Sequence, residues 1–482
     1  MLLRHSFFYA LARGIPGIVN FLAIAIYTRM MTPGEYGAYA LVIAAVGLFD
    51  SVLFQWLRLG LLRFLPHYSK SPHVLLSTLF LAFLVVIAFT SFLGIAAHFI
   101  WEGEQEKRLL IVGLILLWIQ GWYELELELA RSQLAPIRYG IMSIFKSLFA
   151  LTVGILFLLY GMGETAPLLG LISGMAVASL LFACREWRFI HPEAFEIPLL
   201  KKLLHYGLPM TATYTLAFLV GSSDRFMLGW FLGADAPGLY APGYDLTQFS
   251  LLMLLTVVNL AAYPLVVRAM EHEGIAEARE KLKDVLVLSV AVALPVATGL
   301  AVCSETIAGV MLGERYHDSA SDLIPVIAVS SFLFGIKVFY LDLAFQLSKK
   351  TYIEPKIMLV AALVNVLLNL WWIPLFGLIG AASATVVAYG IGGYLAWRLG
   401  REVFPLPAPS EDVWKVCLIS GIMGLVLWLT PGGNGVVALL GQVTMGMLVY
   451  LSGLLLLDVA GVRKMLLDRI SAHQTTRREA RP

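Results

Sequence analysis

The chain has 482 residues, of which 59% are hydrophobic and 14% are charged, and its formal net charge is +2. Soluble proteins contain about 45–50% apolar and about 25% charged residues, so these charges are too few to cover a water-facing surface. The composition therefore excludes a string of soluble domains and predicts a membrane protein. Nucleic acid is excluded as a partner because no basic block lies beside interleaved aromatic residues.

Apolar runs of membrane-spanning length recur along the whole sequence. A hydrocarbon core of about 30 Å requires about 20 helical residues. Fourteen runs meet this requirement, at residues 7–30, 37–61, 74–98, 109–131, 138–160, 165–186, 206–232, 240–267, 284–306, 322–347, 355–375, 378–399, 413–430 and 436–457. The sequence therefore predicts an all-α polytopic membrane protein with 14 transmembrane helices.

The distribution of Lys and Arg predicts how these helices are oriented. Most of the 34 basic residues fall in cytoplasmic loops and helix ends if the N-terminus is inside, whereas Arg225 and Lys337 remain within the membrane. The first run contains Arg13 and continues to Met30, so we expect a retained helix rather than a cleaved signal peptide. We predict a plasma (cell inner) membrane location with both termini cytoplasmic.

A weak internal repeat predicts how the helices are grouped. Gly-Ile-Pro at 14–16 matches Gly-Leu-Pro at 207–209, and the outer turns at 36–40 and 237–241 also match. Both copies start inside, so the repeat is parallel, with its axis along the membrane normal. The predicted divisions are an N-terminal lobe of helices 1–6 (1–200), a C-terminal lobe of helices 7–12 (201–405), helices 13 and 14 (406–460) and a cytoplasmic basic tail (461–482).

Short motifs at the start, middle and end of residues 7–400 carry a family resemblance. They are Asn-Phe-Leu at 20–22, Tyr-Thr-Arg at 27–29, Thr-Pro-Gly-Glu-Tyr-Gly-Ala-Tyr at 32–39, Tyr-Gly-Leu-Pro at 206–209, Ser-Asp-Arg-Phe-Met-Leu-Gly at 223–229, Gly-Leu-Tyr at 238–240 and Gly-Leu-Ile-Gly-Ala-Ala at 377–382. Together they resemble polysaccharide transporters, the Wzx-type flippases of the multidrug/oligosaccharidyl-lipid/polysaccharide (MOP) exporter superfamily. This resemblance implies a MATE/MurJ-like fold of two bundles around a cavity that opens alternately to each side.

The same resemblance implies a cargo. That cargo is an undecaprenyl-pyrophosphate-linked oligosaccharide, the repeat unit of O-antigen, capsule or exopolysaccharide, moved from the cytoplasmic to the periplasmic leaflet. The implied partners are this lipid-linked oligosaccharide, membrane lipids, and the polymerase and other polysaccharide assembly proteins. Without ATP machinery, uphill transport also needs H⁺ or Na⁺ as a coupling ion.

Two sister groups of the superfamily remain as alternatives. MATE-like cation and drug antiporters usually carry an acidic residue within helix 1, whereas the first carboxylate here is Glu35, at the outer exit of that helix. Lipid II flippases lack the Pro-Gly-Glu-Tyr-Gly turn at 33–37. Both differences favour the polysaccharide branch.

The sequence does not predict an enzymatic activity. A nucleotide-driven pump is excluded because there is no Gly-x4-Gly-Lys-Ser/Thr loop. Membrane glycosyltransferases, polymerases and ligases usually need a large soluble domain or a long loop that carries acids or His, and the outer loops here are short. The sequence shows no cluster of metal ligands and no cofactor motif, so we predict neither a metal nor a cofactor.

Charged residues within the predicted helices are the candidate site. A charge at mid-bilayer costs about 2.5–3.5 kcal/mol on insertion scales, so each one needs a partner or an aqueous cavity. Asp50, Asp224, Arg225 and Lys337 are such residues. They either line a cavity that receives the pyrophosphate headgroup or join helices through Asp50–Lys337 and Asp224–Arg225 pairs.

Further polar residues extend this candidate cavity. Arg58 and Arg63 would bind diphosphate near the cytoplasm, or snorkel to the interface. Arg29, at the outer end of helix 1, is also a candidate cavity residue. Tyr244, near an outer exit, would contact saccharide. The remaining pair, Asn365 and Asn369, share a helix face that suits a sugar, although buried Asn more often joins helices.

Carboxylates on the fourth predicted helix are candidates for ion coupling. Glu124 and Glu128 form an i, i+4 stripe, and burial favours the neutral form of a carboxyl group, so this stripe would exchange protons. Asp50 is a third candidate. The alternative for Glu128 is an ordinary i, i+3 pair with Arg131 at the interface.

Overall fold

The computed structural model describes residues 2–68, 70–133, 135–182, 187–188, 190–430, 433, 435–461 and 463, and their side chains from Gly14 onward. Every long element in this part of the chain is an α-helix. Twelve helical stretches among the described residues are long and apolar enough to cross a membrane. The chain is therefore an all-α polytopic membrane protein, as its composition predicts.

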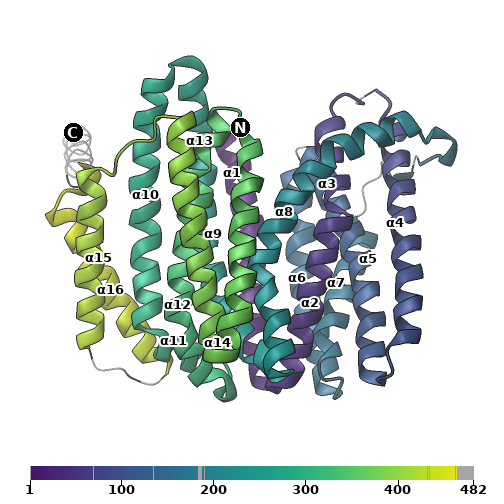
Figure 1. Ribbon diagram of the computed structural model, residues 1–482, viewed down its shortest axis with the longest axis horizontal. Coiled ribbons are helices and arrows are strands. Elements are labelled where there is room, and N and C mark those ends of the chain that lie inside the picture. Colours follow the sequence, from purple (N-terminus) through teal and green to yellow (C-terminus); the bar gives the residue numbers. More distant parts are fainter. Residues whose placement is uncertain are drawn as a thin grey trace, which may run out of the picture. The chain divides into compact units, whose positions relative to one another are not determined.

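The helices follow one another through short connections (Figure 1). The first are α1 (Leu2–Met30), α2 (Pro33–Leu53), α3 (Gln55–Phe64), α4 (Pro72–Ile100), α5 (Glu104–Ser132), α6 (Pro136–Leu159), α7 (Thr165–Phe182) and α8 (Ile197–Leu232). The rest are α9 (Asp235–His272), α10 (Ile275–Val302), α11 (Ser304–Met311), α12 (His317–Ile336), α13 (Leu343–Leu347), α14 (Glu354–Val403), α15 (Glu411–Leu429) and α16 (Val436–Leu456). Short segments are η2 (Pro192–Ala194), η3 (Glu314–Tyr316), the π-helix η4 (Lys337–Leu341), η5 (Thr351–Ile353) and η6 (Val459–Gly461).

The turn between α1 and α2 shows how a local motif sets a helix start. The Thr32 side chain accepts a hydrogen bond from the backbone N–H of Glu35, and the Glu35 carboxylate accepts one from the backbone N–H of Thr32 at 2.8 Å. This is a capping box, which satisfies two N–H groups that the helix start leaves without partners. Pro33 occupies the first helical position, where its missing N–H has no cost.

The structure yields twelve candidate spans where the sequence predicts fourteen, and the difference lies in α14 and α1. First, α14 is counted once although it has 50 residues and would be about 75 Å long if straight. Gly377, with φ 60° and ψ −135°, interrupts this helix between the predicted runs 355–375 and 378–399. Second, the predicted run 7–30 lies within the 29-residue helix α1, whose side chains are described from Gly14, and the described part, Gly14–Met30, is apolar.

The helices form two compact units. Unit 1 contains Met1–Pro242 and Met358–Ala381, and unit 2 contains Gly243–Ile357 and Ala382–Pro482. The main apolar core of unit 1 lies among α2, α3, α4, α5 and α8. In unit 2 the main core lies among α9, α10, α13, α14, α15 and α16. Charged side chains on α3, α5 and α6 in unit 1, and on η4 in unit 2, are therefore held against apolar helices.

The predicted divisions of the chain stay predictions. Of the segment 406–460, α15 and α16 belong to unit 2. The predicted basic tail, 461–482, lies outside the described residues except for Gly461 and Arg463.

Candidate translocation site

An ion pair joins α2 and α3 inside unit 1. Arg58 Nη2 lies 2.7 Å from Asp50 Oδ2, and Nη1 donates a longer bond of 3.4 Å to Oδ1. The two side chains are only 12% and 9% exposed. The sequence predicts one continuous helix here, but the chain is interrupted at Phe54, and Arg58 reaches back to Asp50. The Nε of Arg58 is buried and has no hydrogen-bond partner among the described residues, so this guanidinium keeps a donor for a further ligand.

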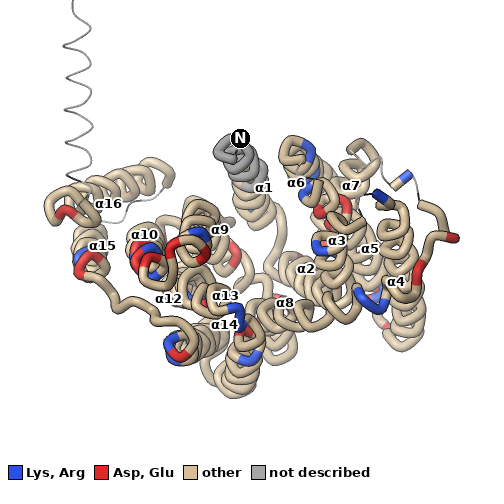
Figure 2. The backbone as a smooth tube through the Cα atoms, turned by 90° about the horizontal axis from the view of Figure 1, so that it is seen from above, with Lys and Arg blue, Asp and Glu red and all other residues tan. Residues whose placement is uncertain are grey.

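Glu124 of α5 interacts electrostatically with this ion pair, with a lysine of α6 and with a second carboxylate of α5. The charges that act on Glu124 are those of Arg58, Lys146, Asp50 and Glu128. We call these five residues the polar cluster of unit 1. Figure 2 shows basic positions on α3 and α6 with acidic positions close to them. The polar cluster contains two cations and three carboxylates, which gives it one excess negative charge when every group is ionised.

Lys146 is the member of the polar cluster that the sequence analysis misses. Its Nζ lies 5.9 Å from the centre of the Tyr123 ring, within the range of a cation–π contact. By sequence alone, Lys146 falls among the basic residues of cytoplasmic loops and helix ends, because Arg225 and Lys337 are the basic residues predicted within the membrane. Its position in the apolar run 138–160 was the available signal.

The carboxylates of α5 point in two directions. Glu128 forms the expected i, i+3 pair with Arg131 at 3.4 Å, but its Oε1 is buried without a hydrogen-bond partner among the described residues. Glu126 is 1% exposed and faces Ser179 of α7 and the charge of Arg138 on α6. This divergence follows from helical geometry, because residues two apart point about 200° from one another.

A second polar cluster in unit 1 joins α8, α9 and α14. Asp224 is fully buried and accepts hydrogen bonds from Tyr240 Oη at 2.9 Å and from Asn369 Nδ2 at 2.6 Å. Asn369 also donates a 3.2 Å hydrogen bond to Asn365 Oδ1. The same oxygen accepts a 2.9 Å hydrogen bond from the Ser223 hydroxyl. These bonds connect three helices, as expected for buried amides that join helices. Arg225, next to Asp224, is 7% exposed.

The remaining predicted residues lie outside these two clusters. Arg29 donates to the Ala25 carbonyl of its own helix at 2.6 Å and is exposed. Arg63 is exposed with its guanidinium 5.9 Å from the Tyr206 ring centre. In unit 2, Tyr244 is 2% exposed and its hydroxyl accepts a bond from Gln248 at 2.9 Å.

Lys337 has its own acidic partner in unit 2. Its Nζ lies 2.8 Å from Asp342 Oδ2, and both residues are buried. Asp50 and Lys337 therefore each have a partner close in sequence rather than one another. Among the described residues, no three His, Cys, Asp or Glu side chains are grouped so that they could hold a metal ion.

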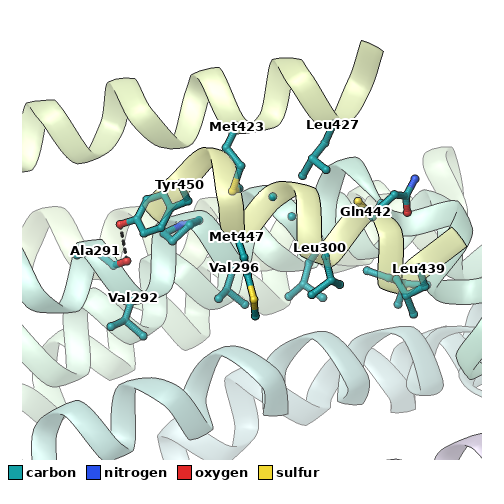
Figure 3. A pocket seen from close by; sticks show the side chains of 16 residues that line it. Ala291, Val292, Val296, Leu300, Met423, Leu427, Leu439, Gln442, Met447 and Tyr450 are labelled. Carbon is teal, nitrogen blue, oxygen red and sulfur yellow. Dashed lines mark hydrogen bonds between the residues drawn. The ribbon is translucent and has the colours of Figure 1, made fainter. Parts of the chain in front are cut away.

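Unit 2 also contains an apolar pocket of about 440 Å³ between α10, α15 and α16 (Figure 3). At one end Tyr450 Oη donates a 2.7 Å hydrogen bond to the Ala291 carbonyl. The side chains in Figure 3 are mostly aliphatic and include Val296, Leu300 and Met447. Because none of the described residues that line it is charged, this pocket fits hydrocarbon rather than a charged headgroup.

The fold defines the class of protein. The structure superposes on the lipid II flippase MurJ in an inward closed conformation with a TM-score of 0.76 over 94% of this chain and 99% of that chain, at 17% sequence identity. An inward-facing multidrug-resistance MATE transporter of the MOP superfamily gives a TM-score of 0.64 over 82% of this chain and 97% of that one, at 14% identity. The chain therefore has the MurJ/MATE-like fold.

Sequence comparison defines the family within that class. Residues 26–321, more than half of the chain, match the family described as "Polysaccharide biosynthesis protein". The chain belongs to this family. The resemblance seen in the sequence motifs is thus confirmed.

Individual relatives are distant. The "Probable flippase AglR" of Haloferax volcanii is 26% identical over 42% of this chain and 43% of its own length. The "Probable low-salt glycan biosynthesis flippase Agl15" of the same organism is 22% identical over 62% of each chain. This chain thus spans less than two thirds of either relative. The "Putative O-antigen transporter" of Shigella flexneri is 22% identical over 79% of this chain and 93% of its own length.

Proposed function

We propose that this protein flips undecaprenyl-pyrophosphate-linked oligosaccharides from the cytoplasmic to the periplasmic leaflet of the plasma membrane. The cargo is a repeat unit of O-antigen, capsule or exopolysaccharide. Family membership supports this proposal, as do the names of the relatives, a probable flippase and a putative O-antigen transporter. The observation that carries it is the polar cluster of unit 1, which holds two cations, Arg58 and Lys146, among apolar helices.

These cations suit a diphosphate. Guanidinium groups bind phosphate oxygens through two parallel hydrogen bonds, and Arg58 already presents its Nη atoms to the carboxylate of Asp50. A phosphate group would replace that carboxylate with the same geometry. Lys146 then contributes a second positive charge, while the lipid tail stays in the bilayer.

Ion coupling follows from the charge balance of the polar cluster. A phosphate that displaces Asp50 adds negative charge to a site in which Arg58, Lys146 and the Arg131 that pairs with Glu128 already face three carboxylates. Burial disfavours charged carboxylates, so protonation of Asp50, Glu124 or Glu128 accompanies binding. We therefore propose H⁺ as the coupling ion at these residues, with Na⁺ as the alternative.

The transport cycle requires a complete membrane topology. We propose fourteen crossings, with α14 crossing twice on either side of Gly377, both termini cytoplasmic, and two six-helix lobes followed by α15 and α16. Alternating access arises from rocking of the lobes. The polymerase and other polysaccharide assembly proteins take up the flipped product.

The test is the lipid-linked saccharide pool of a strain from which the gene is deleted. We expect this pool to accumulate on the cytoplasmic face and to clear when the gene is restored, and mass spectrometry would then identify the cargo. An unchanged pool with altered sensitivity to toxic cations or drugs would instead assign an exporter. Accumulation of peptidoglycan precursors would assign a lipid II flippase.

A further inference from the structure

Unit 2 contains a buried charged group that is separate from the coupling candidates of unit 1. Lys337 and Asp342 stand at the two ends of the π-helical turn η4, and the Asp342 N–H donates to the Lys337 carbonyl at 2.9 Å. Their side chains form the 2.8 Å ion pair, and the residues are 3% and 4% exposed. π-helical turns are rare and frequently mark functional sites.

A second carboxylate faces this ion pair. Glu354 begins α14, directly after the turn that follows α13. The groups that act on Glu354 are the charges of Asp342 and Lys337 and a hydrogen bond from Gln346. Tyr340, on the same π-helical turn, instead directs its hydroxyl to the carbonyl of Pro407 at 3.4 Å.

The two carboxylates each keep one oxygen without a partner. Asp342 Oδ1 and Glu354 Oε1 are both buried, and neither forms a hydrogen bond with any described residue. A buried carboxylate oxygen without a donor is costly. Lys337 already neutralises one of the two carboxylates, so the second negative charge has no counter-charge within the group.

We propose that Asp342 and Glu354 hold one exchangeable proton between them. One proton makes the group neutral, because one ammonium then balances one carboxylate. The added O–H group also provides the missing hydrogen-bond donor for an unpartnered oxygen. Because Lys337 and Asp342 lie at the two ends of the π-helical turn, gain or loss of this proton changes the electrostatic force across that turn.

The charge balance predicts how the number of bound protons changes with substitution. Glu354→Gln and Asp342→Asn each leave one carboxylate with one ammonium, so each variant binds no proton at neutral pH. Lys337→Met leaves two carboxylates without a cation, so this variant binds more protons than the wild type. A Glu354 protonated by burial alone would keep its proton in Asp342→Asn.

The experiment is infrared spectroscopy of the purified full-length protein in lipid nanodiscs across a pH series. The carbonyl stretch of protonated carboxyl groups is separate from the bands of carboxylates, so it counts bound protons. The control is Glu280→Gln, because Glu280 is an exposed acid of α10 that forms only a surface pair with Lys283. Size-exclusion chromatography and circular dichroism verify that each variant is folded.

We expect the neutral-pH band to lose the intensity of one carboxyl group in Glu354→Gln and Asp342→Asn, to gain intensity in Lys337→Met and to keep its intensity in Glu280→Gln. Undiminished intensity in Asp342→Asn, or intensity that fails to grow in Lys337→Met, would overturn the shared proton. If Asp342→Asn does not fold, Glu354→Gln and Lys337→Met decide the question by the same rules. The measurement uses no transport substrate, so its outcome is independent of the proposed flippase activity.

Discussion

The Asp50–Arg58 pair allows a quantitative test of the polar cluster of unit 1. Removal of one partner from a buried ion pair costs about 3–5 kcal/mol, whereas replacement of both partners by neutral groups is often close to neutral. The side chains here are 12% and 9% exposed, which places the expected cost of Asp50→Asn near the lower limit, about 3 kcal/mol. We therefore expect the double variant Asp50→Asn/Arg58→Met to be more stable than Asp50→Asn alone.

The assay is a double-mutant cycle on purified protein in mixed micelles. Reversible unfolding by increasing fractions of dodecyl sulfate gives the free energy of unfolding of each variant. A matched control pair is Glu104–Lys107, which has a similar distance of 3.0 Å but a glutamate that is 90% exposed. We expect a coupling energy of about 2–3 kcal/mol for the buried pair and about 0–1 kcal/mol for the exposed pair.

Equal coupling energies for the two pairs would refute this reasoning. In that case Asp50 and Arg58 would be as well solvated as surface residues, and a phosphate would gain little by replacing the carboxylate. A large coupling energy, by contrast, would support the proposed exchange of anionic partners at Arg58.

Three further predictions concern charge and backbone geometry. Lys146→Met should lower saccharide export about tenfold or more, as expected for loss of a charge-assisted contact, whereas the surface variant Lys283→Met should complement a deletion strain fully. Glu124→Gln should blunt the dependence of transport on the pH gradient in vesicles, and retention of the wild-type dependence would exclude Glu124 as a coupling group. Gly377→Ala should destabilise the protein by about 1–3 kcal/mol, because its φ of 60° and ψ of −135° suit only glycine. Gly390→Ala should be neutral or stabilising, because open space lies where its Cβ would be and its φ is not positive; equal effects of the two substitutions on unfolding would contradict this assignment.

Helix positions were predictable from the sequence because the bilayer sets both their length and their composition. The break in α14 illustrates the strength of that signal. The predicted runs 355–375 and 378–399 leave a gap that contains Gly377, where the backbone leaves the helix. The Thr-Pro-Gly-Glu motif at 32–35 likewise has a local cause, the capping box that begins α2.

The partners of the charged residues were less accessible to sequence reasoning. Regular helical periodicity gave no reason to pair Asp50 with Arg58, eight residues later, and the interruption at Phe54 was not anticipated. The Lys337–Asp342 pair depends on a π-helical turn, which a period of 3.6 residues does not describe. Asn369 and Asp224 are 145 residues apart in sequence, so only packing of the folded chain brings them together.

Internal charge balance links the two buried groups in physical terms. The group around Lys337 has two carboxylates for one cation and becomes neutral by binding one proton. In the polar cluster of unit 1, Arg131 pairs with Glu128, so its charges balance until an anion enters. An anionic substrate that takes Arg58 from Asp50 leaves a further carboxylate without a counter-charge, so its binding favours proton uptake. Linkage is reciprocal, and protonation must therefore strengthen substrate binding by the same factor. On the proposed function, cations that are neutralised in this way would bind the diphosphate and also couple its transport to protons, which fixed and unpaired cations would not do.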